Sequence, residues 1–194
     1  MEFFIAKNKW LVLLFGAVIQ IFAGIPAAWG VFQKSVENEY ALNQQATSLI
    51  FSFTIAAFGV GCILGGALQD KASPRIACII GGILLAVGFV GSGFLPPENA
   101  LALYLVFSVN VGMGCAFLYP SVMSCVQKWY ADKKGLATGV VGGAVGLSGI
   151  MLATVGRFLI KTTGIRGCFI TLGVTLLILS CLGAVVMVNP TGEN

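Results

Sequence analysis

The chain has 194 residues, of which 58% are hydrophobic and only 9% are charged, and its formal net charge is +4. A soluble globular domain carries about 25% charged residues, so this composition excludes soluble, disordered, collagen-like and nucleic-acid-binding proteins. With a mean hydropathy of +0.97, the chain is predicted to be an integral membrane protein. It contains no histidine, which removes imidazole as a base or metal ligand, and we expect no metal and no cofactor.

The predicted elements are six apolar segments, each long enough to cross the roughly 30 Å of hydrocarbon in a bilayer as a helix. In chain order they cover residues 10–32, 46–68, 76–95, 101–126, 135–160 and 167–188. We therefore expect an all-α integral membrane fold with six transmembrane helices in one domain, residues 1–194. All six cysteines fall inside these segments and are interpreted as small buried apolar residues.

Proline and glycine mark local features of these segments. Pro26 and Pro120 lie inside the first and fourth segments, where each removes a backbone hydrogen bond and favours a kink or a local break. Three Gly-x-x-x-Gly pairs place glycines one helical turn apart, which lets helix backbones approach closely. These pairs are Gly61/Gly65, Gly139/Gly143 and Gly142/Gly146.

The basic residues are distributed unevenly between the two ends of the predicted bundle. One end carries seven of the eleven: Lys7, Lys9, Lys71, Arg75, Lys128, Lys133 and Lys134. The other end carries Lys34, Lys161 and Arg166, with Arg157 close by. Because cytoplasmic loops are enriched in Lys and Arg, we expect both termini to be cytoplasmic and the protein to lie in the plasma (inner) membrane.

The second connection contains a motif with a fixed spacing: Gly66, Leu68, Asp70, Lys71 and Arg75. This motif resembles the Gly-x-Leu-x-Asp-Arg/Lys-x-Gly-x-Arg signature of the major facilitator superfamily, except that Ser73 replaces the second glycine. The resemblance implies a fold of two inverted three-helix repeats, which is one half of a twelve-helix transporter. It also implies that part of the motif acts as a cytoplasmic latch: Gly66, Asp70, Lys71 and Arg75.

The fourth connection reads Lys-Trp-Tyr-Ala-Asp-Lys-Lys-Gly-Leu-Ala-Thr-Gly over residues 128–139. It resembles the oxalate/formate antiporter family and, more loosely, the monocarboxylate transporters. Trp129, Lys133 and Lys134 are of the types that anchor a helix at the lipid head groups, and we interpret them as an interfacial anchor loop. The resemblance implies transport of small organic anions by alternating access, with a small carboxylate as substrate and no nucleic-acid partner. It also implies a second six-helix half, supplied by the same chain, by a separate chain or by a homodimer.

Candidates for the substrate cavity come from a repeated pattern in the first and fourth segments. Gln20 precedes Trp29 by nine residues, and Asn110 precedes Tyr119 by the same interval. Nine residues turn an ideal helix by about 900°, so the amide and the aromatic ring of each pair point to opposite sides. We favour the aromatic residues as the cavity lining. In the alternative, the amides bond neighbouring helices and the aromatic residues only pack.

Arg157 is a further candidate, because it is the one charged residue inside a predicted segment. It either attracts anions at the outer end or extends its side chain to water. Ser108 stands where many superfamily members carry an arginine used in proton coupling, which favours anion exchange or facilitated movement.

Other classes of function were weighed against transport. The run Gly146-Leu147-Ser148-Gly149 resembles the nucleophile motif of rhomboid proteases, but that mechanism needs a histidine base. We therefore expect the protein not to be an enzyme. A non-transporting regulatory or assembly protein, or a channel-like oligomer, remains the alternative.

Overall fold

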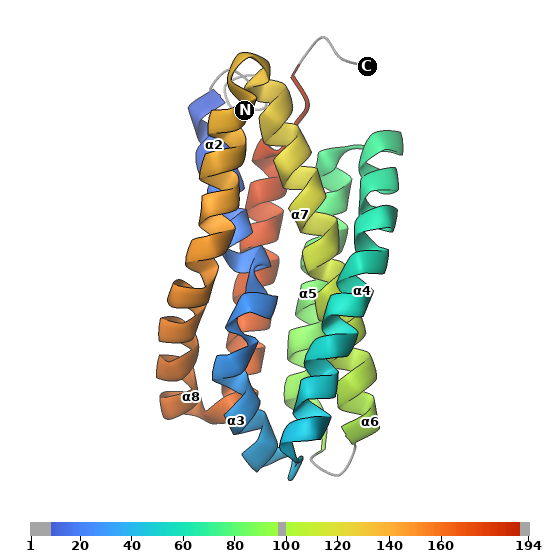
Figure 1. Cartoon of the computed structure of the whole chain (residues 1–194), viewed down its shortest axis with the longest axis vertical. Coiled ribbons are helices and arrows are strands. Elements are labelled where there is room, and N and C mark those ends of the chain that lie inside the picture. The colour runs from blue at the N-terminus through green and yellow to red at the C-terminus, as the bar shows by residue number, and fades with distance from the viewer. Residues whose placement is uncertain (1–8, 97–99, 191–194) are drawn as a thin grey trace.

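The computed structural model describes residues 9–96 and 100–190, and their regular structure is helical (Figure 1). The elements are α2 (Lys9–Ala23), η1 (Ile25–Ala28), α3 (Trp29–Glu39), α4 (Gln44–Lys71), α5 (Pro74–Phe94), α6 (Ala100–Leu103), η2 (Tyr104–Val109), α7 (Asn110–Trp129), η3 (Ala131–Lys133) and α8 (Lys134–Val186). Among the described residues, four stretches are long and apolar enough to cross a membrane: Gln44–Lys71, Pro74–Phe94, Leu101–Trp129 and Ala131–Val186. The all-helical membrane fold is thus shown, while the count of six spans remains a prediction.

The first predicted span is interrupted near its middle. Helix α2 ends at Ala23, the 3₁₀ turn η1 follows with Pro26 in its first turn, and α3 begins at Trp29. The break predicted at Pro26 is therefore confirmed. Its physical reason is that proline has no N–H to donate to the preceding turn. By contrast, α7 runs unbroken through Pro120, and the irregular turn of that span is the π-helical η2.

Side-chain caps and a single glycine explain where the other helices begin and turn. Asn43 caps α4 by accepting a 2.8 Å hydrogen bond from the Ala46 N–H. Inside α8, Gly164 has φ 73° and ψ 177°, a conformation that glycine adopts without steric cost. The chain reverses there, so residues 134–163 descend and residues 165–186 return to the top of the view (Figure 1).

The beginning of α2 and the end of α8 lie at the same end of the bundle as the α4–α5 and α7–α8 connections (Figure 1). This arrangement places Lys9 at the same end as the basic residues of both connections. Lys7 lies outside the described residues. The side of the membrane that this end faces remains a prediction.

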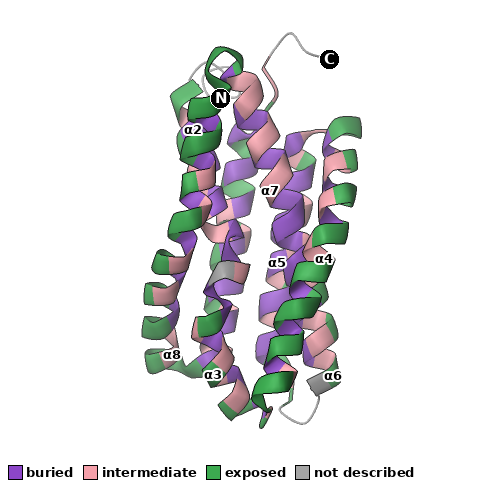
Figure 2. Cartoon of the chain, viewed as in Figure 1, coloured by how far each residue is buried: buried purple, intermediate pink, exposed green. Residues whose placement is uncertain are grey.

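Close helix contacts occur at one of the three predicted glycine pairs. A side chain at Gly61 or Gly65 would run into Ala116 and Phe117 of α7, so this pair does bring α4 against α7. A side chain at Gly139, Gly142, Gly143 or Gly146 would meet no described atom within 4 Å. For those two pairs the prediction is wrong within this chain, because their side of α8 faces outward (Figure 2).

A cluster of buried aromatic rings forms part of the core. One of the elements that carry it is α3, which lies in the lower half of Figure 1. Phe107 of η2 lies at its centre, stacked on Phe169 of α8 at 5.4 Å and edge-on to Phe89 of α5 at 5.3 Å between ring centroids. Trp29 and Phe32 of α3 complete the cluster. Four separate elements of the chain therefore meet at these rings.

Candidate functional site

Gln20 is completely buried between α2 and α7. Its Nε2 donates a 2.9 Å hydrogen bond to the backbone carbonyl of Tyr119, the residue before Pro120. Its Oε1 has no hydrogen-bond partner among the described residues. The amide therefore joins the two helices that the sequence pattern pairs, which is the contact that the alternative interpretation assigns to it.

The two aromatic candidates occupy different environments. Trp29 is 6% exposed, and its ring lies 5.2 Å from that of Phe107, so it belongs to the aromatic core. Tyr119 is partly exposed and meets Phe58 of α4 edge-on, with 6.1 Å between ring centroids. In this conformation Tyr119 is therefore open to a solute at the bundle surface and Trp29 is not.

Asn110 lies at the junction between the π-helical turn and α7. Its Nδ2 donates a 2.9 Å hydrogen bond to the Val106 carbonyl in the same segment, and its Cβ lies beside Gly88 of α5. Tyr119 instead faces α4. The Asn110 amide thus bonds within its own segment and does not join a neighbouring helix, whereas the Tyr119 ring contacts α4.

Arg157 is exposed on residues 134–163 of α8, one position after Gly156, which packs against Phe32. At the same end of the bundle, Arg166 forms an ion pair with Glu39, with 2.9 Å between Nε and Oε1. This pair connects the end of α3 to the returning part of α8. Sequence reasoning assigned no role to Glu39, because its partner is far away along the chain.

A second polar contact at this end joins α3 to α4. The Thr47 hydroxyl donates a 2.8 Å hydrogen bond to Glu37 Oε1, and the Gln33 amide donates to both residues. Glu37 and Gln33 lie one helical turn apart on α3, and Thr47 lies in the first turn of α4. This contact was also missed by sequence reasoning, since it depends on how α3 and α4 meet.

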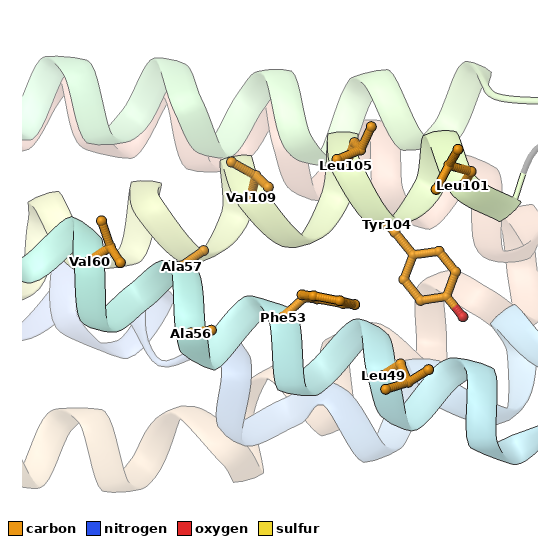
Figure 3. A pocket seen from close by; sticks show the side chains of 9 residues that line it. All are labelled: Leu49, Phe53, Ala56, Ala57, Val60, Leu101, Tyr104, Leu105 and Val109. Carbon is orange, nitrogen blue, oxygen red and sulfur yellow. The ribbon is translucent and has the colours of Figure 1, made fainter.

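An apolar groove of about 520 Å³ lies between α4 and the α6–η2 segment (Figure 3). Its lining residues are Leu49, Phe53, Ala56, Ala57, Val60, Leu101, Tyr104, Leu105 and Val109. The Tyr104 hydroxyl donates to the Ala46 carbonyl at 2.8 Å, so its ring is the part that contributes to the lining. A site for an organic anion needs a few converging polar groups, and the residues lining this groove do not supply them.

The latch motif lies at the opposite end of the bundle from the aromatic core. Ser73, which replaces the usual glycine, caps α5 by accepting a 3.3 Å hydrogen bond from the Ile76 N–H. Gly66 is partly buried with open space around it, and Asp70 and Lys71 are exposed. Arg75 reaches the end of α8, where its guanidinium donates to backbone carbonyls at 3.0 and 3.3 Å.

The anchor loop lies at the same end. Trp129 is partly buried, and its Nε1 donates a 2.7 Å hydrogen bond to the Val188 carbonyl. Tyr130 donates from its hydroxyl to the Lys9 carbonyl at 3.2 Å, and burial raises the pKa of this hydroxyl above its ordinary value. Lys133 and Lys134 are exposed.

Ser148, the residue that resembles a protease nucleophile, is fully buried. Its hydroxyl lies within hydrogen-bond distance of two carbonyl oxygens, that of Val145 in the same helix at 2.6 Å and that of Gly24, at the break between α2 and η1, at 3.1 Å. It therefore joins two helices. The described residues also contain no group of three or more His, Cys, Asp or Glu side chains that could hold a metal ion.

Comparison with known proteins agrees with these features. The chain is 24% identical over 184 residues to the "Oxalate:formate antiporter" of Oxalobacter formigenes, an alignment that covers 94% of this chain and 43% of that protein. It is 30% identical over 179 residues to "Monocarboxylate transporter 13" of Rattus norvegicus, covering 90% of this chain and 41% of that protein. The chain thus spans less than half the length of these relatives.

The fold has a counterpart among solved structures. The major facilitator superfamily proton:xylose symporter XylE superposes with a TM-score of 0.71 at 17% identity, covering 91% of this chain and 44% of the symporter chain. The model of the Major Facilitator Superfamily matches residues 11–194. These findings indicate an integral membrane protein of the family to which these transporters belong. The chain therefore belongs to the Major Facilitator Superfamily, as its loop motifs predict.

Proposed function

We propose that this chain is a six-helix half of a transporter that moves small organic anions, of the oxalate/formate or monocarboxylate type, by alternating access. The observation that carries the proposal is the match over 94% of the chain to 43% of an oxalate:formate antiporter. A half of such a protein contains the helices that line one wall of a central cavity. A small carboxylate is then the substrate, and the helix end with the basic connections faces the cytoplasm of a plasma (inner) membrane.

The helix packing supports an arrangement of two inverted three-helix repeats. Helix α7 packs on α4 and α5, whereas α2 packs on both parts of α8. In this arrangement one repeat starts with α2 and continues with α4 and α5, and the other starts with α7 and continues with the two parts of α8. The first helix of each repeat therefore packs on the last two helices of the other, as a twofold relation between inverted repeats requires. Two serine hydroxyls bond across equivalent pairs: Ser108 donates to the Ile50 carbonyl of α4, and Ser148 donates to the Gly24 carbonyl before η1.

Among the candidate cavity residues, Tyr119 and Arg157 have the exposure that direct contact with a substrate requires. A guanidinium binds a carboxylate with charge-assisted hydrogen bonds, so Arg157 supplies the attraction for an anion. Trp29 and Gln20 are buried and act from inside the bundle, by supporting the break in the first span and by joining α2 to α7. Asn110 belongs to the packing between α7 and α5.

The outward faces of α4 and α8 support the presence of a second six-helix half. Gly59 of α4 and Gly139, Gly143 and Gly146 of α8 are exposed, with no described atom within 4 Å of a side-chain position. Glycine on a membrane helix lets another helix approach closely. A second half, from the same chain, another chain or a second copy, then covers these faces.

The test is counterflow in proteoliposomes, using labelled oxalate, formate and lactate. The chain is reconstituted alone and together with the second half of an oxalate:formate antiporter. Saturable flux that an unlabelled anion on the opposite side stimulates supports the proposal. Flux that rises linearly and is not stimulated indicates a channel-like oligomer, and the absence of flux in both preparations refutes transport by this half.

A further inference from the structure

The last turn of α8 is held by more than its own backbone. The final carbonyls of a helix have no donor inside the helix. The Gly183 carbonyl accepts from the Met187 N–H at 2.9 Å, and the Val186 carbonyl accepts from the Val188 N–H at 3.0 Å. The carbonyls of Ala184 and Val185 accept from the Arg75 guanidinium at 3.0 and 3.3 Å.

The contact with α8 explains the position of Arg75. Arg75 follows Pro74 in the first turn of α5, where the positive end of the helix dipole disfavours a cation. The same charge is favourable at the C-terminal end of a helix, which is where the guanidinium lies, next to the last carbonyls of α8. Its contact with α8 therefore offsets an unfavourable position in α5.

Helix α7 holds the residues that follow α8. The Trp129 indole donates to the Val188 carbonyl at 2.7 Å, and the Cys125 thiol lies 3.6 Å from the same oxygen. Between these contacts and α8, Met187 is fully buried and its side chain reaches Gly16 of α2. Residues 184–188, here called the exit segment, therefore contact α2, α5 and α7 at one point.

We propose that Arg75 and Trp129 are positioning residues that lock the exit segment to α5 and α7. Water alone can satisfy the last carbonyls of an exposed helix end. Here, instead, two side chains from different helices, α5 and α7, donate hydrogen bonds to carbonyls of one five-residue segment. The inference rests on the proposed function for its consequence: where the second half is joined covalently to the exit segment, a movement of that half is transmitted to α7, which carries Tyr119.

The lock is tested by measuring the reaction of Cys125 with a charged maleimide in the full chain in lipid nanodiscs, read by peptide mass spectrometry. Cys125 is fully buried beside the exit segment. W129F keeps an aromatic ring, although a smaller one, and loses the N–H. R75K keeps the charge and loses the forked donor. Loss of one such hydrogen bond increases opening about threefold to tenfold, and Cys125 is expected to react faster by that factor. W10F is the matched control, because Trp10 is 64% exposed.

Two results overturn the lock. One is an unchanged Cys125 reaction rate in both W129F and R75K. The other is a parallel rise at Cys168, which is fully buried four residues after the reversal of α8 at Gly164, because the substitutions then loosen the whole fold.

The consequence for transport has its own readout. In counterflow, W129F is expected to lower the maximal exchange rate about threefold to tenfold with an unchanged half-saturation concentration, since the anion site is intact. A change confined to the half-saturation concentration, or no change at all, contradicts the transmission to α7. If the unsubstituted chain exchanges no anion, the proposed function fails, while the labelling result still decides whether the exit segment is locked.

Discussion

The contact between Gly24 and Ser148 offers a sharp test of how the broken first span is held. Gly24 has φ −77° and ψ 19°, a backbone conformation open to any residue, so an alanine there meets only a steric obstacle. That obstacle is mainly Ser148, whose Oγ and Cβ both occupy the place of a Gly24 side chain. The Val145 carbonyl oxygen lies 3.2 Å from the same place, a tight contact that a shift of a few tenths of an ångström relieves. Rotation of the hydroxyl relieves only the contact with Oγ. Gly24→Ala therefore forces α2–η1 away from α8.

The magnitude follows from the atoms involved. Overpacking of a close contact costs about 1–3 kcal/mol. Ser148→Gly removes both obstructing atoms, at a cost of about 0.6 kcal/mol for the hydrogen bond to the Gly24 carbonyl and about 0.5–1 kcal/mol for a glycine inside a helix. The double variant Gly24→Ala with Ser148→Gly is thus expected to be no less stable than Ser148→Gly alone. The coupling energy between the two positions is then about 1–3 kcal/mol.

Thermal unfolding in one detergent, followed by thiol exposure of the buried cysteines, measures these differences, with each kcal/mol worth about 2–4 °C in melting temperature. Gly30→Ala is the matched control, because a side chain there meets no described atom within 4 Å, and its effect is expected to stay within about 0.5 kcal/mol. The reasoning is refuted if Gly24→Ala is as stable as Gly30→Ala, or if Ser148→Gly does not rescue it.

Three further outcomes are expected. Phe107→Ala is expected to cost about 3–5 kcal/mol of unfolding free energy, because the ring is 1% exposed at the centre of the aromatic core. Phe94→Ala, at a residue 73% exposed, is the comparison. Equal melting temperatures of the two variants would contradict the assigned core. Glu39→Gln removes the ion pair with Arg166, and a loss below about 1 kcal/mol that fades in high salt is expected; a larger loss insensitive to salt is the contrary result. Arg157→Gln is expected to raise the half-saturation concentration for anion exchange severalfold without lowering the melting temperature, and unchanged kinetics would remove Arg157 from the substrate path.

Local chemistry explains why much of the fold was predictable. Apolar length is set by bilayer thickness, so the apolar segments indicate a membrane protein without reference to their neighbours. The break at Pro26 depends on a missing N–H within one helical turn. The loop motifs are contiguous as well, which is why the family was predicted correctly from them.

The candidate site was less predictable, because exposure depends on how each helix is rotated in the bundle. Trp29 and Tyr119 occupy matching positions in the sequence pattern, yet one is in the aromatic core and the other is partly exposed. The helical period separates an amide from a ring nine residues away, but it does not reveal which of the two meets a neighbouring helix. Only the packing against Phe107 and Phe58 decides this.

The sequence by itself therefore determined that the chain is a helical membrane protein, which family it belongs to, and where its first span breaks. Each of these depends on composition or on residues within a few positions of one another. The tertiary structure decided which of three identical glycine spacings is packed: Gly61/Gly65 lies against α7, whereas a side chain at Gly139/Gly143 or Gly142/Gly146 would meet no described atom within 4 Å. It also decided that Arg75 and Trp129 bind the end of α8, more than a hundred and about sixty residues away along the chain. Such contacts exist only when separate helices are brought together, and no local pattern encodes that.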